Sequence, residues 1–595
     1  MAGLIAILAP GSAAPIADRQ LDGLERSYSA LRGADPAHRV GAGALGTAAV
    51  YGGPGGVGAG WRTAGASWTL YVGEPHPAGE LTAADPASLD GQFALIAYDA
   101  DAGRVDVVSD PFGLQAIYLA ERGGATYVST SVLALARHLG SRPSARGLEV
   151  FLLTGPHFGE LTGWEGIRRL PPATHVSLRR GEPPRERVYW RPAIDPTVAR
   201  MGLDDAARHC VEVASATFRD RLAGRADACA DVTGGFDSRL STLLLDRAGV
   251  GFATTTNGAD DSPDVLLGAR VAAAAGWGWT QGQLPGDWAE RSGDAVGRAV
   301  AWGDGQMEAT QLAEVLTLQA ACAARSSTLF GGGGGEHWRD YAWQQEIPGG
   351  GRSTRVNFDR WVNVRFLHPQ DLSPLRTDPT AEVRAGLVER CRAFAAPYAD
   401  LLNSAQLDML YAYKSMGHFG AYQSASRGTI HVELPFYFRD AFTAVFSVAP
   451  AHRNSHRLMR RSIPLLDPRI ARLETTVGGP AEPMSLGNAH RFLPYLENRV
   501  GGVARKLTER LPGPTIGAVS ASVPGVVAQT RRRLLAELSA ATGLDPARMR
   551  AGRLYDAGGL ARLASSATAT TSGWATLGRI ITVELALEAA DASLE

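Results

Sequence analysis

The chain has 595 residues, of which 59 are basic and 60 acidic, so its formal net charge is -1. This balance excludes a protein that binds nucleic acid or a membrane surface mainly through its charge, and a hydrophobic share of 45% excludes wholesale disorder. Four scattered cysteines without a CxxC pair exclude a disulfide framework and a zinc site of that type, and they indicate a reducing, cytoplasmic location.

The N-terminal segment Met1 to Pro15 is apolar and carries no basic residue, which predicts the absence of a signal peptide. No run approaches the roughly 18 apolar residues of a membrane helix. Up to about residue 190, short β-branched or aromatic runs predict strands. These are Leu4 to Leu8, Phe93 to Tyr98, Arg104 to Val108, Ala116 to Leu119 and Thr126 to Ser129. The glycine-rich segment Tyr51 to Gly60 predicts a flexible connector, and residues 179–187 and 192–196 predict a linker.

From about residue 200, helical periods alternate with short strands. Helices are expected at Leu203 to Leu222, Ser238 to Ala248, from Asp261 onward, and at Met307 to Arg325. Strands are expected at Ala226 to Val232, Gly251 to Thr256 and Ser326 to Phe330. This alternation predicts a parallel sheet wrapped by helices, followed by a mainly helical region beyond about residue 375.

The most informative segment is Thr233-Gly234-Gly235-Phe236-Asp237-Ser238, which joins a predicted strand to a predicted helix. Two glycines allow successive N–H groups to face an anion, and the helix N-terminus adds unpaired donors. The hydroxyls of Thr233 and Ser238 can complete a phosphate site, with Asp237 holding magnesium. The alternative is an ordinary strand-to-helix turn.

This segment resembles the S-G-G-x-D-S pyrophosphate loop of the ATP-pyrophosphatase fold. Residues 89–99 and 109–113 resemble the Ntn-type amidohydrolase domain that precedes the synthetase domain in class B asparagine synthetases, and residues 166–172 resemble the end of that domain. Ser262-Pro263-Asp264, Leu434-Pro435-Phe436 and residues 580–585 resemble later landmarks of the same family. The resemblance implies an α/β chain with an Ntn-like αββα sandwich over residues 1–190. Residues 191–595 would then form an ATP-pyrophosphatase domain with a helical C-terminal part.

One departure from the family narrows the expected activity. A glutamine-hydrolysing domain needs an N-terminal cysteine nucleophile, but position 2 is Ala2 and the first cysteine is Cys210. The resemblance then implies an enzyme that adenylates a carboxylate with ATP and magnesium, without ammonia from glutamine. The amine would arrive with the substrate, as in lasso peptide cyclases, which close a macrolactam on an Asp or Glu side chain, and in β-lactam synthetases.

On this resemblance the chain is a cytoplasmic bacterial ligase of natural-product biosynthesis. It would act on a peptide or a small amino-acid-derived substrate, with a leader peptidase or a precursor-recognition protein as a further partner. The alternatives are an ammonia-dependent asparagine synthetase, a β-lactam synthetase-like enzyme, and a non-catalytic descendant that binds nucleotide or peptide.

A second landmark, residues 329–341, resembles the family's S-G-[DE]-G-x-D-E stretch, whose acids lie beside the adenylate. Here Gly332 and Gly335 replace acids and Glu336 remains, either as a second magnesium ligand beside Asp237 or as a helix-capping residue. The five glycines would allow a nucleotide or a peptide to approach the backbone closely. By the same resemblance, Val232, Thr254 and Gly331 line the adenine and ribose. The phosphate loop itself comprises Thr233, Gly234, Gly235, Phe236, Asp237 and Ser238.

The family's catalytic lysine is replaced by His456 in the run His456 to Arg460, so Arg457, Arg460 or Arg461 could supply the fixed positive charge. The only lysines in the chain are Lys414 and Lys506. Lys414 is therefore a second catalytic candidate, although a solvated helix-surface position is the simpler interpretation. His431 and Glu433 fall where the family lines its site with Glu and Arg. The aromatic residues between 411 and 438 are expected to be mainly core, with a peptide-binding surface as the alternative.

Overall fold

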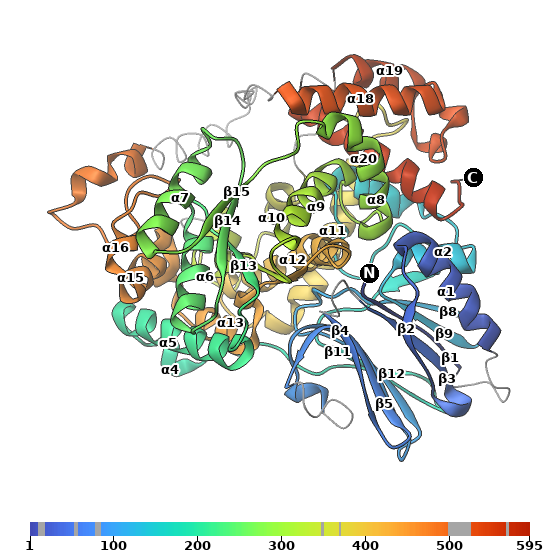
Figure 1. The fold of residues 1–595 in the computed structure, drawn as a ribbon, viewed down its shortest axis with the longest axis horizontal. Helices are drawn as coiled ribbons and strands as arrows, with labels where there is room; N and C mark the ends of the chain where they lie inside the picture. The colour runs from blue at the N-terminus through green and yellow to red at the C-terminus, as the bar shows by residue number, and fades with distance from the viewer. Residues whose placement is uncertain are drawn as a thin grey trace.

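The computed structural model describes residues 1–9, 18–52, 58–77, 85–346, 350–367, 371–497, 525–566 and 570–594. These residues form a mixed α/β structure with two antiparallel sheets and one parallel sheet, as expected at that level (Figure 1). In Figure 1 the antiparallel sheets (blue) lie at the lower right, and the C-terminal helices (red) lie at the top.

The first antiparallel sheet, sheet A, has the strand order β10-β8-β9-β1-β3-β2. Its strands are β1 (Gly3–Leu8), β2 (Pro36–Gly41), β3 (Gly46–Tyr51), β8 (Tyr118–Arg122), β9 (Ala125–Ser129) and β10 (Ile167–Arg169). Successive side chains of a strand point to opposite faces. Ile5 and Ile7 of β1 therefore pack with helices α1 (Asp18–Arg32) and α2 (Val132–Leu139), whereas Leu4 and Leu8 face the second sheet.

The second antiparallel sheet, sheet B, has the order β12-β11-β7-β6-β5-β4. Its strands are β4 (Ala59–Ala64), β5 (Ser67–His76), β6 (Asp90–Asp99), β7 (Arg104–Ser109), β11 (Thr174–Arg179) and β12 (Arg185–Val188). On its outer face Phe93 and Leu95 pack with Leu89 and Tyr189. The expected αββα sandwich needs a helical layer here. Among the described helices of residues 1–190, α3 (Ala145–Thr154) packs instead against helices of the C-terminal part, so irregular segments cover this face.

The linker predicted over residues 179–187 is wrong. β11 ends at Arg179, the chain turns at Gly181 with φ +75°, and β12 pairs back onto β11. The charged residues that suggested a linker belong to an exposed edge strand, where charge discourages pairing with other chains. The predicted connector over residues 51–60 falls largely on residues 53–57, which lie outside the described residues; its described ends belong to β3 and β4.

The parallel sheet has the order β15-β14-β13-β16-β17. Its strands are β13 (Ala228–Asp231), β14 (Ala253–Asn257), β15 (Trp279–Gly282), β16 (Thr328–Phe330) and β17 (His431–Glu433). Ala230 and Phe330 face a core cluster that includes side chains of α5, α6, α13 and α15, whereas Cys229 and Leu329 face a second cluster with side chains of α9 and α12. Both faces of the sheet are therefore buried, as parallel sheets require.

The helices of the C-terminal part follow the expected periodicity, and α5 has the predicted bounds. They are α4 (Pro196–Ala199), α5 (Leu203–Leu222), α6 (Phe236–Arg247), α7 (Pro263–Ala275), α8 (Trp288–Gly303), α9 (Ala309–Ala323), α10 (Phe358–Arg365), α11 (Thr380–Ala395), α12 (Asn403–Ser426), α13 (Arg439–Phe446), α14 (Pro450–Arg453), α15 (Arg457–Leu466), α16 (Pro468–Ala471), α18 (Gly525–Thr542), α19 (Ala557–Ser566) and α20 (Thr571–Ala589). Among the described residues, none of these helices has the length and hydropathy needed to cross a lipid bilayer.

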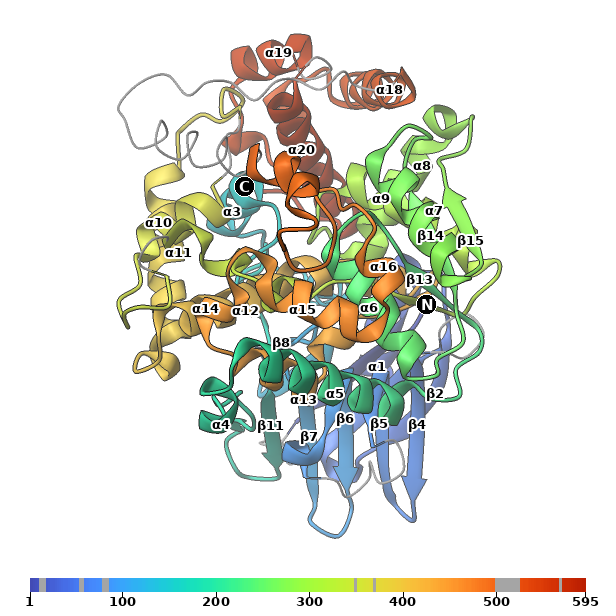
Figure 2. The same ribbon diagram turned by 90° about the vertical axis from the view of Figure 1, so that its left-hand side faces the viewer.

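Buried polar contacts join the antiparallel sheets to the C-terminal part, and Figure 2 shows α5 and α13 above strands β4–β7. The side-chain amide of Gln92 on β6 makes both contacts with Leu434. Its Nε2 donates to the Leu434 carbonyl (2.7 Å), and its Oε1 accepts from the Leu434 N–H (3.3 Å). Asp90 accepts from the Arg439 N–H (3.1 Å). The segment that resembles an amidohydrolase therefore contributes to the contact between the two parts of the chain.

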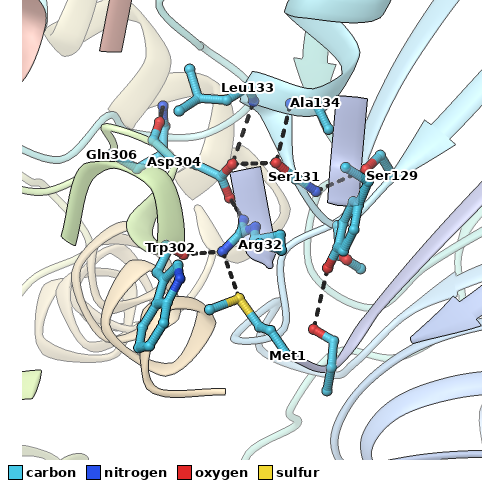
Figure 3. Close-up of polar contacts among 12 residues, drawn as sticks. Met1, Arg32, Ser129, Ser131, Leu133, Ala134, Trp302, Asp304 and Gln306 are labelled. Atoms are coloured by element: carbon cyan, nitrogen blue, oxygen red, sulfur yellow. Dashed lines mark hydrogen bonds and ion pairs between the residues drawn. The ribbon is translucent and has the colours of Figure 1, made fainter. Parts of the chain in front are cut away.

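A buried ion pair forms a second connection (Figure 3). Arg32, at the end of α1, binds Asp304, which follows α8, and both side chains are 1% exposed. Asp304 also accepts from the Ser131 hydroxyl and from the Leu133 N–H (3.4 Å) at the start of α2. One carboxylate therefore links α1, α2 and α8.

Candidate active site

The turn between β13 and α6 is braced by its own hydroxyl groups. The Thr233 N–H donates to Ser238 Oγ (3.0 Å), the two hydroxyl oxygens lie 2.9 Å apart, and the Gly235 N–H donates to Thr233 Oγ1 (3.1 Å). Gly235 occupies the N-cap position of α6 and has no side chain to accept from the helix N-terminus. The first-turn N–H groups of a helix lack acceptors within that helix, so the turn retains the donors that an anion site needs.

Gly234 is held from both sides. Its N–H donates to Asp264 Oδ1 (3.1 Å), and its carbonyl accepts from the Thr476 N–H (3.0 Å). A Cβ atom at this position would lie 2.5 Å from Thr476 Cγ2, so the position requires glycine. Asp264 belongs to the Ser-Pro-Asp landmark, but no local pattern predicted that its carboxylate lies on the turn.

The glycine segment Gly331 to Gly335 packs directly on the first turn of α6. A Cβ added to Gly332 would lie 2.9 Å from the backbone nitrogen of Ser238, and one added to Gly335 would lie 2.6 Å from Asp237 Cβ. The sequence predicted close approach of this segment to a nucleotide or a peptide; the close approach in the structure is to α6. Acidic residues at these two positions do not fit this packing, because their side chains would overlap α6.

This packing predicts that Gly335→Asp, which reintroduces the family's acid, destabilises the protein. Overpacking of this kind typically costs about 1–3 kcal/mol, and the new carboxylate would also face Asp237. The free energy of unfolding, measured by urea denaturation, should fall accordingly. Gly386→Asp on α11 is the matched control, because an added Cβ there meets nothing within 4 Å. Equal stability of the two variants would show that the glycine segment does not pack on α6 as described.

Asp237 is ion-paired in this structure. Arg339 donates to both of its carboxylate oxygens, at 2.8 and 3.2 Å. Glu336 is also engaged, because its Oε2 accepts from the Gly334 N–H (2.9 Å) and its Oε1 accepts from the Tyr411 hydroxyl (3.2 Å). Each oxygen of the two predicted magnesium ligands therefore already accepts one hydrogen bond, and a magnesium ion would share these oxygens with the protein donors.

Lys414 lies near Glu336 and is not the solvated surface residue of the simpler interpretation. It is half-buried on α12, one helical turn beyond Tyr411. Burial, and then the charge of Arg365, lower the pKa of Lys414 to about 8, while the charge of Glu336 opposes this change. Burial and the charge of Asp237 raise the pKa of Glu336. The two groups therefore occupy one poorly solvated environment, which is typical of catalytic sites.

Aromatic rings hold two arginines beside this pair. The guanidinium groups of Arg339 and Arg365 lie over the Tyr341 ring, at 4.8 and 4.3 Å from its centroid, and Tyr341 packs edge-on against Tyr411. Together with Lys414 these arginines supply three positive charges, against two negative charges from Asp237 and Glu336. This excess of positive charge suits an anionic ligand. Arg339, Arg365 and Tyr341 were not predicted as site residues, because no local motif marks them.

His456 and Arg460 reach the other flank of the turn through Phe236. The Phe236 ring stacks on His456 (4.6 Å between centroids), and the Arg460 guanidinium lies 4.9 Å from the same ring. Ser455 and His456 both have positive φ, 57° and 63°, which is rare for consecutive non-glycine residues and typical of functional sites. Burial lowers the pKa of Arg460 to about 10.

The other arginines proposed to replace the family's lysine lie elsewhere. Arg457 donates to the Ala451 carbonyl (3.1 Å), Arg461 pairs with Asp204 (3.2 Å), and both are exposed. Of the arginines considered there, Arg460 is the one that reaches the turn. Lys506 lies outside the described residues.

The residues predicted to line the adenine and ribose lie on β14 (Thr254) or directly after β13 and β16 (Val232 and Gly331). The Val232 side chain is fully buried in the core cluster around α6. Thr254 pairs in register with Ala230, before the end of β13, and its hydroxyl donates to the Gly278 carbonyl (2.8 Å). Ligands of parallel sheets bind beyond the carboxyl ends of the strands. Thr254 lies near the start of β14, whereas Thr256 lies near its carboxyl end and donates through its hydroxyl to the Val232 carbonyl (2.5 Å). Gly331 donates to the Glu433 carbonyl (3.0 Å) and lies at the end of β16.

The remaining predicted groups divide between core and interface. Tyr437 and Phe438 are fully buried, as expected for core residues, whereas Tyr411 contributes to the site. His431 and Glu433 hydrogen-bond to each other (3.0 Å) and face Glu74 of β5, which lies across the interface from them.

Comparison with known proteins adds little to this geometry. No family model and no curated protein matches the chain. One solved structure with similarity is glutamine phosphoribosylpyrophosphate amidotransferase from B. subtilis, complexed with ADP and GMP. The match has 12% identity, spans 42% of this chain and 65% of that chain, and has a TM-score of 0.21. A similarity of this size does not establish a shared fold.

Proposed function

We propose that this protein is an ATP-dependent amide-forming ligase that activates a carboxylate by adenylation and joins it to an amine of the same substrate. The substrate we propose is a peptide in which an Asp or Glu side chain is joined to the N-terminal amine, as in lasso peptide cyclases. This proposal is supported by the charged residues that surround the N-terminus of α6. Arg339, Glu336 and Lys414 lie on one flank of this uncapped turn, and Arg460 lies on the other.

In the proposed first step, a substrate carboxylate oxygen attacks the α-phosphorus of ATP and pyrophosphate leaves. The first-turn N–H groups of α6, Arg339 and Lys414 would stabilise the negative charge that develops on the phosphate oxygens, since electrostatic stabilisation needs fixed cations and donors. We derive no step through magnesium, because the oxygens of Asp237 and Glu336 are already engaged by protein donors.

In the proposed second step, the amine attacks the activated acyl carbon, AMP leaves and the amine loses a proton. Glu336 is the group we assign to accept that proton. Its raised pKa makes it a stronger base than an exposed carboxylate, and the hydrogen bond from Tyr411 fixes one of its oxygens. The sum of the two steps is one amide bond, AMP and pyrophosphate from a carboxylate, an amine and ATP.

The test is exchange of labelled pyrophosphate into ATP in the presence of synthetic peptides that carry a free N-terminus and an internal Asp or Glu. Exchange that depends on the peptide, together with loss of one water from the peptide by mass, is the expected result. Asp237→Asn removes the carboxylate that positions Arg339 beside the turn, so it should lower exchange by at least about tenfold. Formation of ADP and phosphate, or asparagine formed from aspartate and ammonium with no peptide product, would rule out the proposal.

A non-catalytic descendant that binds nucleotide is the second candidate, and the closed Asp237–Arg339 pair favours it. Calorimetry separates the two functions. Nucleotide binding without exchange for any peptide supports the descendant, whereas exchange excludes it.

A further inference from the structure

A histidine and two glutamates meet between sheet B and the edge of the parallel sheet. His431 Nε2 lies 3.0 Å from Glu433 Oε2 and 3.5 Å from Glu74 Oε1. The three potential ligand atoms all lie within 4.8 Å of one another. Glu74 is on β5, whereas His431 and Glu433 are on β17, so the cluster forms only when the two parts of the chain are in contact.

Two buried polar atoms at this cluster lack hydrogen-bond partners within the described part of the chain. One is Glu433 Oε1, on a side chain that is 0% exposed. The other is His76 Nε2, on the residue two positions after Glu74 and therefore on the same face of β5. Burial lowers the pKa of His76, and the nearby charges of Glu433 and His431 also act on it, but His76 does not belong to the group whose ligand atoms lie within 4.8 Å of one another. A buried polar atom without a partner needs an explanation, and a bound ion is one.

The spacing suits one metal ion. Zinc binds histidine nitrogen and carboxylate oxygen at about 2.0–2.2 Å with tetrahedral geometry, which separates its ligands from one another by about 3.3 Å. His431 Nε2 lies 3.0 Å from Glu433 Oε2 and 3.5 Å from Glu74 Oε1, which is close to this ligand separation. Imidazole and carboxylate together favour zinc and similar transition metals over magnesium or calcium.

We propose that Glu74, His431 and Glu433 bind one divalent transition-metal ion of the zinc class, with the fourth position of the ion left to a water molecule. His431 would carry its proton on Nδ1 and coordinate through Nε2. Arg225 pairs with the second oxygen of Glu74 and would orient that carboxylate as an outer-sphere partner. The ion would take the place of the proton in the hydrogen bond between His431 and Glu433. Its charge would also neutralise the carboxylates of Glu74 and Glu433, of which Arg225 pairs only with Glu74.

The site would join sheet B to the parallel sheet beside the candidate active site. The Glu433 carbonyl accepts from the Gly331 N–H (3.0 Å), and Gly331 begins the glycine segment that packs on α6. Metal binding would therefore fix the position of β17 and, through it, the glycine segment. This inference does not depend on the proposed ligase activity.

Cobalt titration of the full-length, untagged, chelator-treated protein tests the site, because four-coordinate Co²⁺ has intense visible absorption. We expect one equivalent to bind with that spectrum and Zn²⁺ to displace it. Glu74→Gln and His431→Gln should each weaken binding at least about tenfold. Two control variants should bind cobalt like the wild type: His490→Gln, at an exposed histidine, and Asp237→Asn, at the candidate active site. Circular dichroism checks that each variant is folded.

Three results would overturn the proposal: no stoichiometric binding, undiminished binding by folded Glu74→Gln and His431→Gln, or a signal abolished by Asp237→Asn. Each would leave the cluster as an ion-pair network between the two parts of the chain. The spectrum does not involve catalysis, so failure here is distinguishable from failure of the proposed ligase activity.

Discussion

Replacing Lys414 with methionine is expected to lower peptide-dependent exchange of pyrophosphate into ATP by about 10²–10³-fold, the usual effect of removing one group that stabilises developing charge. Methionine retains the apolar stem that packs near Phe366, where Lys414 Nζ lies 5.6 Å from the ring centroid. The substitution therefore removes the charge with little change in packing. Lys414→Arg, which keeps a positive charge, should lose much less activity.

The pH dependence separates a charge requirement from a structural role. With a pKa of about 8, Lys414 is about nine-tenths protonated at pH 7 and about one-tenth protonated at pH 9. Exchange by the wild type should therefore fall above pH 8, whereas Lys414→Arg should show no such fall. Exchange rates from pH 6.5 to 9.5 measure this difference, with Arg384→Met on the exposed surface of α11 as control.

Stability should change in the opposite direction over the same range. The pKa of Lys414 is lower in the folded chain than its ordinary value of 10.5, so the unfolded chain binds this proton more tightly. Below pH 8 the folded state carries the full cost of a charged, poorly solvated lysine, and this cost disappears as the pH rises from 8 towards 10.5. Loss of activity above pH 8 that coincides with unfolding would contradict the assignment, as would equal pH profiles for wild type and Lys414→Arg.

Local patterns in the sequence were sufficient for the elements around the turn. A short apolar strand, two glycines and a helical period predicted β13, the turn and α6, because each signal lies within about ten residues of the next. The period of α5 predicted both of its ends. Edge strand β12 was missed because its residues are charged and all four are exposed, so it lacks the alternation that marks a half-buried strand.

Side chains that approach the turn from distant segments were not predictable in this way. Arg339 pairs with Asp237 across about 100 positions, and Arg365 reaches Tyr341 from a separate helix. The environment of Lys414 depends on how α12 packs, which periodicity alone does not give. The interpretation of Gly332 and Gly335 as lost acids also needed the structure, because only the contact with α6 shows that side chains there would overlap the helix.

Replacing Asp304 with asparagine is expected to destabilise the protein more than any other substitution considered above. Breaking a buried ion pair typically costs about 3–5 kcal/mol. Asp304 acts on two buried guanidinium groups, because it pairs with Arg32 and its charge also raises the pKa of Arg427 against the effect of burial. Asp304→Asn would leave both cations without this carboxylate, so we place it at the upper end of that range.

Arg32→Met should cost less, at the lower end of the same range, because the charge of Asp304 still acts on Arg427, which loses the repulsion from Arg32. Asparagine at 304 can still accept from Ser131 and Leu133 (Figure 3), so the difference between the variants reports the charges rather than the cap of α2. The double variant should lose less than the sum of the two single losses, because the pair interacts directly.

Urea denaturation, followed by tryptophan fluorescence, measures the free energy of unfolding of each variant. Limited proteolysis detects whether the two parts of the chain separate. Arg39→Met is the matched control, because Arg39 is 38% exposed and its ion pairs with Asp22 and Glu25 lie near the surface. Exposed pairs contribute about 0.2–1 kcal/mol, so this variant should unfold close to the wild type. If Arg32→Met proved as costly as Asp304→Asn, Arg427 would not share the carboxylate. If both variants matched Arg39→Met, the buried pair would not hold α1 and α8 together.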